Sequence, residues 1–334
     1  MKKTGFVYSG MAFLSAMLML FPSCVINVRT DRDSKFKRSE GGVSFMQTYP
    51  MSQPVNLKLS TSGGNISTIG YDGDQVEVSF LVAKNGRILD MTLDELKKIA
   101  EVKIISDKSN LEISIDKITE KNISVGFEVK APVNTAAALN TSGGNVSISD
   151  LKANQNMNTS GGNIHINDIV GKVDAGTSGG NIAVNHLTGD VNASTSGGNI
   201  SVYGLKGNIK TSTSGGNIHV SDAEGIVDVS TSGGSIRMDK ISGSVRANTS
   251  GGNISLDMNL LRENLQMETS GGDINCTIPK GLGLNLDLSA DNIETQLLKF
   301  SGASEKNKIL GTMNGGGIPV SLKTSGGYIN LNYK

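Results

Sequence analysis

A six-residue motif recurs through this chain at a fixed period of 18 residues. It reads Thr-Ser-Gly-Gly-Asn-Ile from Thr159. Near-copies begin at Thr61, Thr141, Thr177, Thr195, Thr213, Thr231, Thr249, Thr269 and Thr324. From Thr141 to Thr249 the starts are 18 residues apart six times in succession. A period this short, held this long, is typical of chains built from stacked units that each pack on their neighbours.

Each repeat combines glycines with alternating apolar residues. Counting from its Thr as zero, Gly occupies positions 3 and 12, and aliphatic residues occupy positions 5, 7, 14, 16 and usually 10. One repeat provides Ile182, Val184, Leu187, Val191 and Ala193. Alternation with β-branched residues predicts strands, and both glycines are expected to supply positive-φ turns. The sequence thus predicts an all-β, parallel β-solenoid (β-helix) of about 18-residue coils, stacked about 4.8 Å apart.

Two other repeat structures and one ligand-binding loop do not fit the pattern. A calcium-binding nonapeptide roll needs Gly-Gly-x-Gly-x-Asp, whereas Ile164 and Ile166 occupy the second Gly and the Asp positions. A left-handed hexapeptide helix needs an aliphatic residue every six positions, but position 11 is usually polar, as in Lys152 and Lys206. A phosphate-binding loop needs a Lys after its glycines, and none follows here. The Gly-Gly pairs are therefore interpreted as turns.

The period is interrupted between residues 71 and 130. Alternating apolar residues predict strands here, and residues 92–100 predict one short helix, with Thr92 and Glu95 spaced as in a capping box. Residues 51–130 are interpreted as the first coil plus a β-rich capping subdomain, because a solenoid needs its terminal edge covered. Residues 131–334 are assigned to the solenoid, with degenerate coils after Thr269.

The N-terminus has the features of an export signal. Lys2 and Lys3 precede an apolar run over 11–21 that is short for a membrane span. Ser23-Cys24 resembles a bacterial lipoprotein cleavage site. We therefore predict a lipoprotein signal peptide over 1–23, lipid attachment at Cys24, and a flexible polar tether over 24–50. An ordinary signal peptide with an incidental Cys24 is the alternative.

Composition limits the remaining chemistry. Lys plus Arg equals Asp plus Glu, at 31 each, so the chain lacks the positive charge that nucleic-acid binding requires. The other cysteine, Cys276, replaces an aliphatic residue and is expected to be a buried free thiol. His165 and His219 are three coils apart, too far to share a metal ion, and His186 is also interpreted as a surface residue. No catalytic residue, metal site or cofactor is predicted.

Two rows of polar residues could carry a binding role. Asp150 and Asp168 both occupy position 9 in adjacent coils, so their carboxylates could hold a cation or act as a glycosidase pair. Since His186 and Gly204 follow at that position, turn formation is the simpler role. The Asn at position 4 predicts a ladder of stacked amides, with a ligand-binding row as the alternative. These Asn residues are Asn145, Asn163, Asn181, Asn199, Asn217 and Asn253.

The repeated Thr-Ser-Gly-Gly-Asn-Ile, the segment Phe127-Glu128-Val129-Lys130-Ala131-Pro132 and the later Ile278-Pro279-Lys280-Gly281 together resemble the DUF4097 family of adhesin-like bacterial envelope proteins. The resemblance covers roughly residues 54–334. It implies a β-solenoid and an envelope location, and the lipoproteins common in Bacteroides-type bacteria fit this N-terminus. It brings no catalytic residues.

Together, these features predict a non-enzymatic cell-envelope protein that is exported and anchored through lipid, with the outer membrane as the expected location. Its flat polar faces would contact an unidentified protein or glycan. A periplasmic scaffold or envelope-stress component is the first alternative. A polysaccharide-active β-helix enzyme is the second, although such enzymes generally have longer coils with protruding loops.

Overall fold

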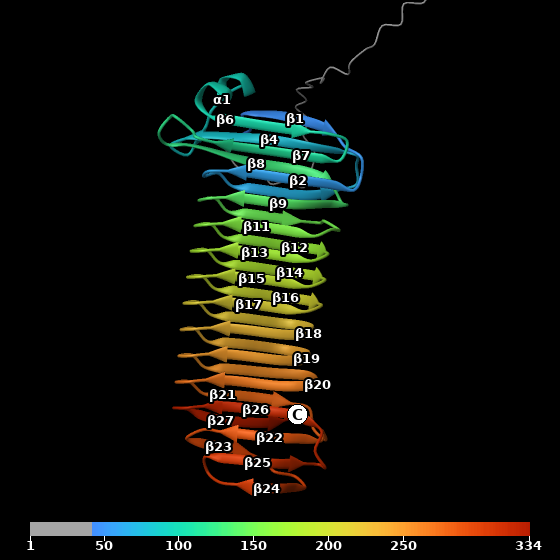
Figure 1. Ribbon diagram of the computed structural model, residues 1–334, viewed down its shortest axis with the longest axis vertical. Coiled ribbons are helices and arrows are strands. Elements are labelled where there is room, and N and C mark those ends of the chain that lie inside the picture. Colours follow the sequence, from blue (N-terminus) through green and yellow to red (C-terminus); the bar gives the residue numbers. More distant parts are fainter. Residues whose placement is uncertain (1–41) are drawn as a thin grey trace, which may run out of the picture.

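The computed structural model describes residues 42–334. This part of the chain contains 27 strands and one short helix, arranged as a long stack of flattened coils (Figure 1). The predicted parallel β-solenoid is confirmed. Each regular coil has one strand on a first face, a corner made by Thr-Ser-Gly-Gly-Asn, one strand on a second face, and a second corner that leads to the next coil.

The regular body runs in sequence order. Its first-face strands are β9 (Thr135–Thr141), β11 (Gln155–Thr159), β13 (Val173–Thr177), β15 (Val191–Thr195) and β17 (Ile209–Thr213). Its second-face strands are β10 (Val146–Ser149), β12 (Ile164–Val170), β14 (Ile182–Thr188) and β16 (Ile200–Lys206). Three longer strands turn the second corner and belong to both faces: β18 (Ile218–Thr231), β19 (Ile236–Thr249) and β20 (Ile254–Thr269).

Parallel pairing in this body keeps the 18-residue register. Ile164 lies beside Ile182 on the second face, and Val173 lies beside Val191 on the first. The aliphatic rows point inward from both faces and are almost fully buried; Ile182, for example, is 1% exposed. One core therefore runs along the stack, and each coil depends on its neighbours to bury its apolar side chains.

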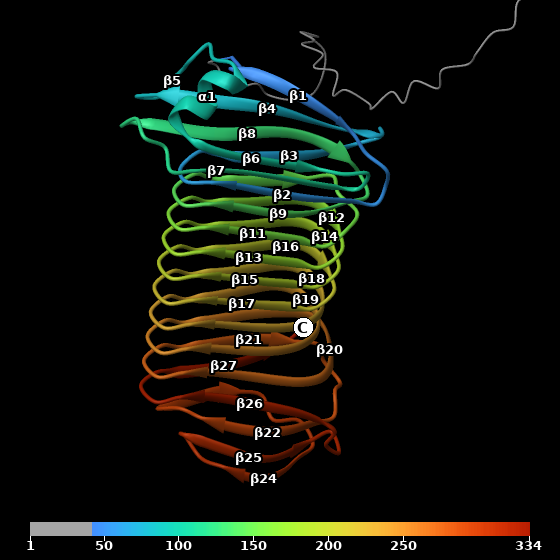
Figure 2. The ribbon, with the colours of Figure 1, turned by 45° about the horizontal axis from the view of Figure 1, so that its top comes forward.

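The N-terminal end does not follow sequence order. β2 (Val55–Thr61) and β3 (Ile66–Tyr71) form a coil that pairs directly with β9 and β10. A second coil, made of β7 (Asn110–Asp116) and β8 (Ile123–Pro132), pairs in parallel on its outer side. The outermost coil is thus later in sequence than the coil it covers (Figure 2).

Antiparallel strands close this end. β4 (Gln75–Lys84) pairs with β8, β1 (Phe45–Pro50) with β4, β6 (Glu101–Ser106) with β7, and β5 (Arg87–Ile88) with β4. The helix α1 (Leu93–Ile99) lies at the same end, with the predicted capping box between Thr92 and Glu95, and Leu96 as its buried residue. The predicted strands and helix of this segment are confirmed.

Two predicted boundaries at this end are wrong. The tether was expected to reach residue 50, but residues 45–50 form β1, where Phe45 stacks on Phe80 with ring centroids 4.4 Å apart. Pairing with β4 orders this segment, whose own sequence does not show that partner. The boundary between capping segment and solenoid at residue 130 falls inside β8, because β7 and β8 form a solenoid coil themselves.

The C-terminal end is also out of order. The last coil, β26 (Ile318–Thr324) and β27 (Tyr328–Tyr333), pairs with β20 and with β21 (Ile274–Ile278). On its other side it pairs with an earlier coil, β22 (Leu284–Ser289) and β23 (Asn292–Thr295). Beyond that coil, β25 (Lys308–Met313) and β24 (Phe300–Ser304) add in antiparallel fashion. Coils at both ends of the stack therefore do not follow sequence order.

Candidate functional site

The Thr of each repeat ties two coils together at the first corner. The hydroxyl Oγ1 of Thr177 donates to the carbonyl of Gly162 in the preceding coil (2.9 Å) and accepts from the N–H of Gly180 in its own coil (3.2 Å). Burial makes these bonds structurally important, because neither backbone group can turn to water instead. The equivalent threonines each donate their hydroxyl to a backbone carbonyl of the adjacent coil: Thr61, Thr141, Thr159, Thr195, Thr213, Thr231, Thr249, Thr269 and Thr324.

The two glycines of this corner have different roles. A Cβ on Gly180 would lie 1.8 Å from the carbonyl oxygen of Gly162, so no larger residue fits between the coils. A Cβ on Gly179 would meet nothing closer than 3.8 Å. Neither residue has a positive φ. The prediction that position 3 needs Gly for its φ is therefore wrong: the close approach of the neighbouring backbone requires it.

The expected Asn ladder exists, but its main bonds run from side chain to backbone. Oδ1 of Asn163 accepts from the N–H of Asn181, and Oδ1 of Asn181 accepts from the N–H of Asn199, each at 2.8 Å. Ser235 substitutes for Asn in one coil, with its hydroxyl accepting from Asn253 at 3.2 Å. Thr, Gly and Asn of the first corner are thus used to hold coils together, which accounts for the motif without a ligand.

The second corner is much more varied. Its position 9 has a left-handed backbone in six successive coils, with φ between 53° and 67°. The residues there are Asp150, Asp168, His186, Gly204, Asp222 and Lys240. The turn role considered for Asp150 and Asp168 is therefore observed, since Asp, Asn and Gly accept this conformation readily. Because only the backbone conformation is shared at position 9, the side chains there are free to differ. Position 12 of the same corner keeps Gly with the predicted positive φ, as in Gly171 at 141°.

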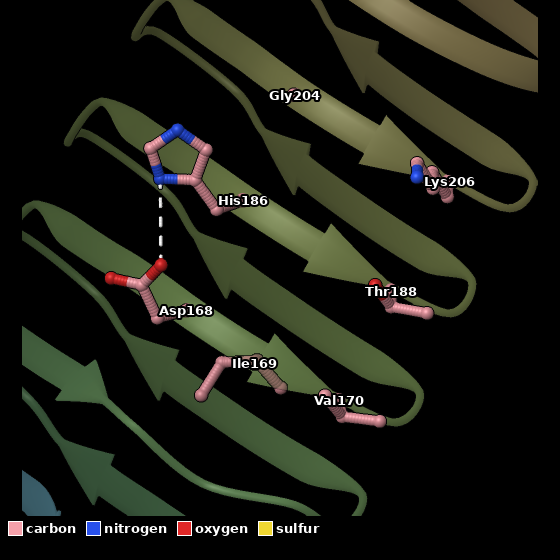
Figure 3. A pocket seen from close by; sticks show the side chains of 7 residues that line it. All are labelled: Asp168, Ile169, Val170, His186, Thr188, Gly204 and Lys206. Carbon is pink, nitrogen blue, oxygen red and sulfur yellow. Dashed lines mark ion pairs between the residues drawn. The ribbon is translucent and has the colours of Figure 1, made fainter.

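A shallow hollow of about 320 Å³ lies at this corner, over the ends of β12, β14 and β16 (Figure 3). Nδ1 of His186 lies 3.5 Å from Oδ1 of Asp168, and both side chains are 59% exposed. Gly204 continues the row without a side chain, and a Cβ there would lie 2.9 Å from the His186 ring. The hollow is lined by Asp168, Ile169, Val170, His186, Thr188, Gly204 and Lys206.

Hydrogen-bonding groups at the hollow remain available. Within residues 42–334, the side chains of Thr188 and Lys206 make no hydrogen bond or ion pair. The ring of Tyr203, 48% exposed, stands edge-on to the His186 ring with centroids 5.5 Å apart. The site thus combines a carboxylate, an imidazole, a hydroxyl and an ammonium group beside an exposed aromatic ring.

The structure does not unite Asp150 with Asp168 in this site. The Asp168 carboxylate meets His186 in the next coil, whereas Asp150 does not line the hollow. His165 and His219 are exposed, as expected, and lie outside it. His219 contacts Asp239 at 3.1 Å, and hydrogen bonding from Arg237 lowers the pKa of Asp239 from its usual value. In residues 42–334 no three His, Cys, Asp or Glu side chains gather as a metal site would require.

A second depression, of about 340 Å³, lies on the first face near Ile226. Two of its polar groups are used between coils, whereas Lys210 and Asp228 make no hydrogen bond or ion pair within residues 42–334. Oδ1 of Asp190 accepts from the N–H of Asn208 at 2.8 Å, and Oδ1 of Asn208 accepts from the N–H of Ile226 at 3.2 Å. The hollow at Asp168 is the better candidate for binding because it adds an imidazole and a neighbouring exposed aromatic ring.

Cys276 has no role in either place. It is a free thiol, 1% exposed, in the apolar row of β21, as its position in the repeat predicts. Burial raises the pKa of this thiol, so it stays protonated and unreactive at neutral pH. Cys24 lies outside the described residues, and its lipid attachment stays a prediction.

Sequence reasoning missed Thr188, Tyr203 and Lys206 as parts of one site, and it treated His186 as an isolated surface residue. The available signal was the row at position 9, which changes from Asp168 through His186 to Gly204 in three successive coils. A residue without a side chain beside two long polar ones leaves a gap on an otherwise uniform surface.

A comparison with known families identifies the chain. The family described as Toastrack DUF4097 matches it over residues 37–332. The chain belongs to this family. The resemblance drawn from the repeat is thereby confirmed, and the β-solenoid is the fold of the family's Toastrack domain.

Solved structures similar to this family member have low sequence identity to it. One is a "putative adhesin" from Bacteroides fragilis NCTC 9343, at 19% identity, covering 70% of this chain and 96% of that one, with a TM-score of 0.42. Another, from Parabacteroides merdae ATCC 43184 and described in the same words, has 13% identity, covers 69% and 95% of the two chains, and has a TM-score of 0.34. No curated protein matches the chain.

The described residues include no helix with the length and apolar character needed to cross a membrane. The one helix, α1, has seven residues.

Proposed function

We propose that this chain is a non-enzymatic, adhesin-like protein of the bacterial cell envelope, anchored by lipid at Cys24, that binds glycan at the hollow beside Asp168. The observation that carries the proposal is the set of unpaired polar groups there. Thr188 and Lys206 have no partner among the described residues, and Asp168 and His186 are exposed beside them.

Glycan fits the chemistry of this surface. Sugar hydroxyls both donate and accept hydrogen bonds; Asp168 provides an acceptor, Lys206 a donor, and Thr188 either. The exposed ring of Tyr203 offers an apolar surface for the C–H groups of a sugar ring. The hollow is open and shallow, as suits one unit of a longer chain rather than an enclosed small molecule.

A glycan array tests the binding site. The full chain, purified in a mild detergent, is compared with Asp168→Asn and Lys206→Met. We expect both variants to lose at least about tenfold in affinity, since charge-assisted bonds are each worth roughly 1.5–3 kcal/mol. Asp150→Asn is the matched control, because it has the same left-handed corner but does not line the hollow. Equal loss in Asp150→Asn, or binding to no glycan on the array, contradicts the proposal.

An activity assay separates binding from cleavage. The full chain is incubated with each bound polysaccharide, and release of new reducing ends is measured with Asp168→Asn as the comparison. We expect no release above that of the variant. Release that depends on Asp168 would support the polysaccharide-active alternative, in which Asp168 acts as an acid or base.

The anchor and the compartment need cell experiments. Metabolic labelling with a palmitate analogue should mark the chain but not its Cys24→Ala variant. Protease treatment of intact cells should then remove the solenoid if it faces the exterior. Full protection of the chain would favour the alternative of a periplasmic scaffold or envelope-stress component.

A further inference from the structure

The first face of the solenoid ends in two edge strands, β6 and β24, that differ in how they are protected; β1, at the edge of the second face, also lacks charged residues. At the N-terminal end, β6 carries Lys103, paired with Glu112 at 3.0 Å, and Glu101, paired with Lys117 at 2.7 Å. Charged side chains of this kind discourage a further strand from adding to an edge. At the far end, β24 (Phe-Ser-Gly-Ala-Ser) has no charge within the strand and pairs only with β25. It is the outermost strand of the stack in both views (Figures 1 and 2).

The free side of β24 has backbone groups in position to pair. Glu305 N–H donates to the Lys308 carbonyl at the turn into β25, at 2.8 Å. Backbone groups along an antiparallel strand alternate between its two sides, so Ser301 and Ala303 also bond toward β25. The N–H and C=O groups of Gly302 and Ser304 therefore point to the open edge. Residues 301–304 are exposed, and none of them is bulky.

The sequence around Gly302 is complementary to itself. If two copies of β24 pair in antiparallel fashion with Gly302 opposite Gly302, residues whose numbers sum to 604 face each other. This register brings Lys299, which precedes the strand with a left-handed backbone, to the same end of the strand pair as Glu305 of the second copy, twice in the symmetric pair. Both residues are exposed and neither makes an ion pair within residues 42–334. Opposite charges facing across antiparallel strands stabilise the pairing.

We propose that the β24 edge is a self-association surface, through which a second copy of this chain adds end to end. The two copies are related by a two-fold axis through Gly302, so the interface uses the same residues on both sides. The first faces join into one continuous sheet by strand addition. Because a single five-residue strand buries little area, the dimer is weak and reversible. Its formation does not depend on the glycan hollow, which lies in the body.

Disulfide trapping tests the register. In the proposed pairing Ser301 lies opposite Ala303 of the second copy, in a pair whose Cα atoms are about 4.5 Å apart. Ser301→Cys and Ala303→Cys chains, each full length and in detergent, are oxidised separately and as a mixture. We expect disulfide dimers in the mixture alone, since identical positions are diagonal neighbours about 7–8 Å apart, beyond the reach of an S–S bond. No dimer in the mixture, or equal dimer in each variant alone, overturns the proposal.

A charge swap tests the ends of the interface. Sedimentation of the full chain should show a dimer at high concentration. Lys299→Glu or Glu305→Lys alone places like charges opposite each other twice, and we expect the dissociation constant to rise about tenfold. The double variant Lys299→Glu with Glu305→Lys should restore it. Unchanged melting temperatures show that the variants are folded. A monomer at every concentration, or no recovery in the double variant, overturns the proposal.

Discussion

The two corners of each coil make the same change of direction with different sequence requirements. At the first corner, Thr177, Gly180 and Asn181 each form a specific contact with the neighbouring coil, and equivalent residues do so along the stack. At the second corner, position 9 shares only a left-handed backbone, and Asp, His, Gly and Lys all occur. Contacts between coils constrain both the Thr and Gly of the first corner and the Gly at position 12 of the second, as in Gly189. Position 9 of the second corner can vary and therefore can carry binding.

The largest expected difference between the corners comes from introducing the same residue at each. Ile182→Asp removes a buried aliphatic side chain beside the first corner and places a carboxylate in the core. We expect the free energy of unfolding to fall by about 4 kcal/mol or more, because three coils share this row. His186→Asp at the second corner should change it by less than about 0.5 kcal/mol, since Asp168 and Asp222 already occupy that position. Thermal melting followed by circular dichroism measures both.

Equal losses in these two variants would show that the second corner is as restricted as the first. No loss in Ile182→Asp would contradict the shared core itself.

Adjacent glycines of the first corner provide the next comparison. Gly180→Ala forces a methyl group into the carbonyl of Gly162, so the coils must move apart; we expect a loss of about 3 kcal/mol. Gly179→Ala adds its methyl group to open space, and we expect a change within about 0.5 kcal/mol. Denaturant unfolding of the two variants side by side gives the difference. If both lose stability equally, backbone conformation and not close approach explains the Gly at position 3.

Removing the buried Thr hydroxyl of the first corner is expected to cause a smaller loss of stability. Thr177→Val keeps the shape of the side chain but removes the hydroxyl that bonds to the Gly180 N–H and the Gly162 carbonyl. The expected loss is about 1–2 kcal/mol. Ser178→Ala, at the exposed neighbouring position, is the control and should be nearly neutral. Hydrogen exchange at the Gly180 amide provides a local readout, and unchanged protection there would argue against the role of this hydroxyl.

The smallest loss of stability is expected from substitutions in the exposed Asn ladder. Asn181→Ala removes the acceptor for the Asn199 N–H, and we expect a loss of about 0.5–1 kcal/mol. Asn181→Asp keeps an acceptor in place, as Asp273 does for Tyr328 at 2.9 Å, and should lose less. The two variants are compared by melting temperature. A larger loss in the Asp variant would mean that the side-chain amide, rather than its acceptor oxygen, maintains the ladder.

The repeat made the body of the fold predictable. Alternating aliphatic residues identify the inward rows, and a constant spacing of 18 identifies the partner of each strand. Local rules were also sufficient for α1, whose capping box involves residues three apart. Prediction failed for β1, because its order comes from pairing with β4, in which Phe45 lies beside Phe80, 35 residues later in the chain.

The candidate site was only partly predictable. Asp168 was singled out, but with Asp150 as its partner, whereas the structure turns it toward His186. Position in the repeat specifies which residues lie in one row. It does not specify which neighbour a long side chain on that row contacts, or where a missing side chain leaves a hollow, as Gly204 does.

By itself, the sequence determined that this chain forms coils, how long each coil is, and which side chains each coil buries. The tertiary structure alone decided the order of coils at the two ends. The hydroxyl of Thr141 donates a hydrogen bond to the carbonyl of Gly64, and that of Thr324 to the carbonyl of Gly272. The same bond joins consecutive coils in the body. Since every coil presents nearly the same edge, local pattern cannot distinguish one partner from another. The choice depends on which arrangement lets antiparallel strands cover the two open edges of the stack.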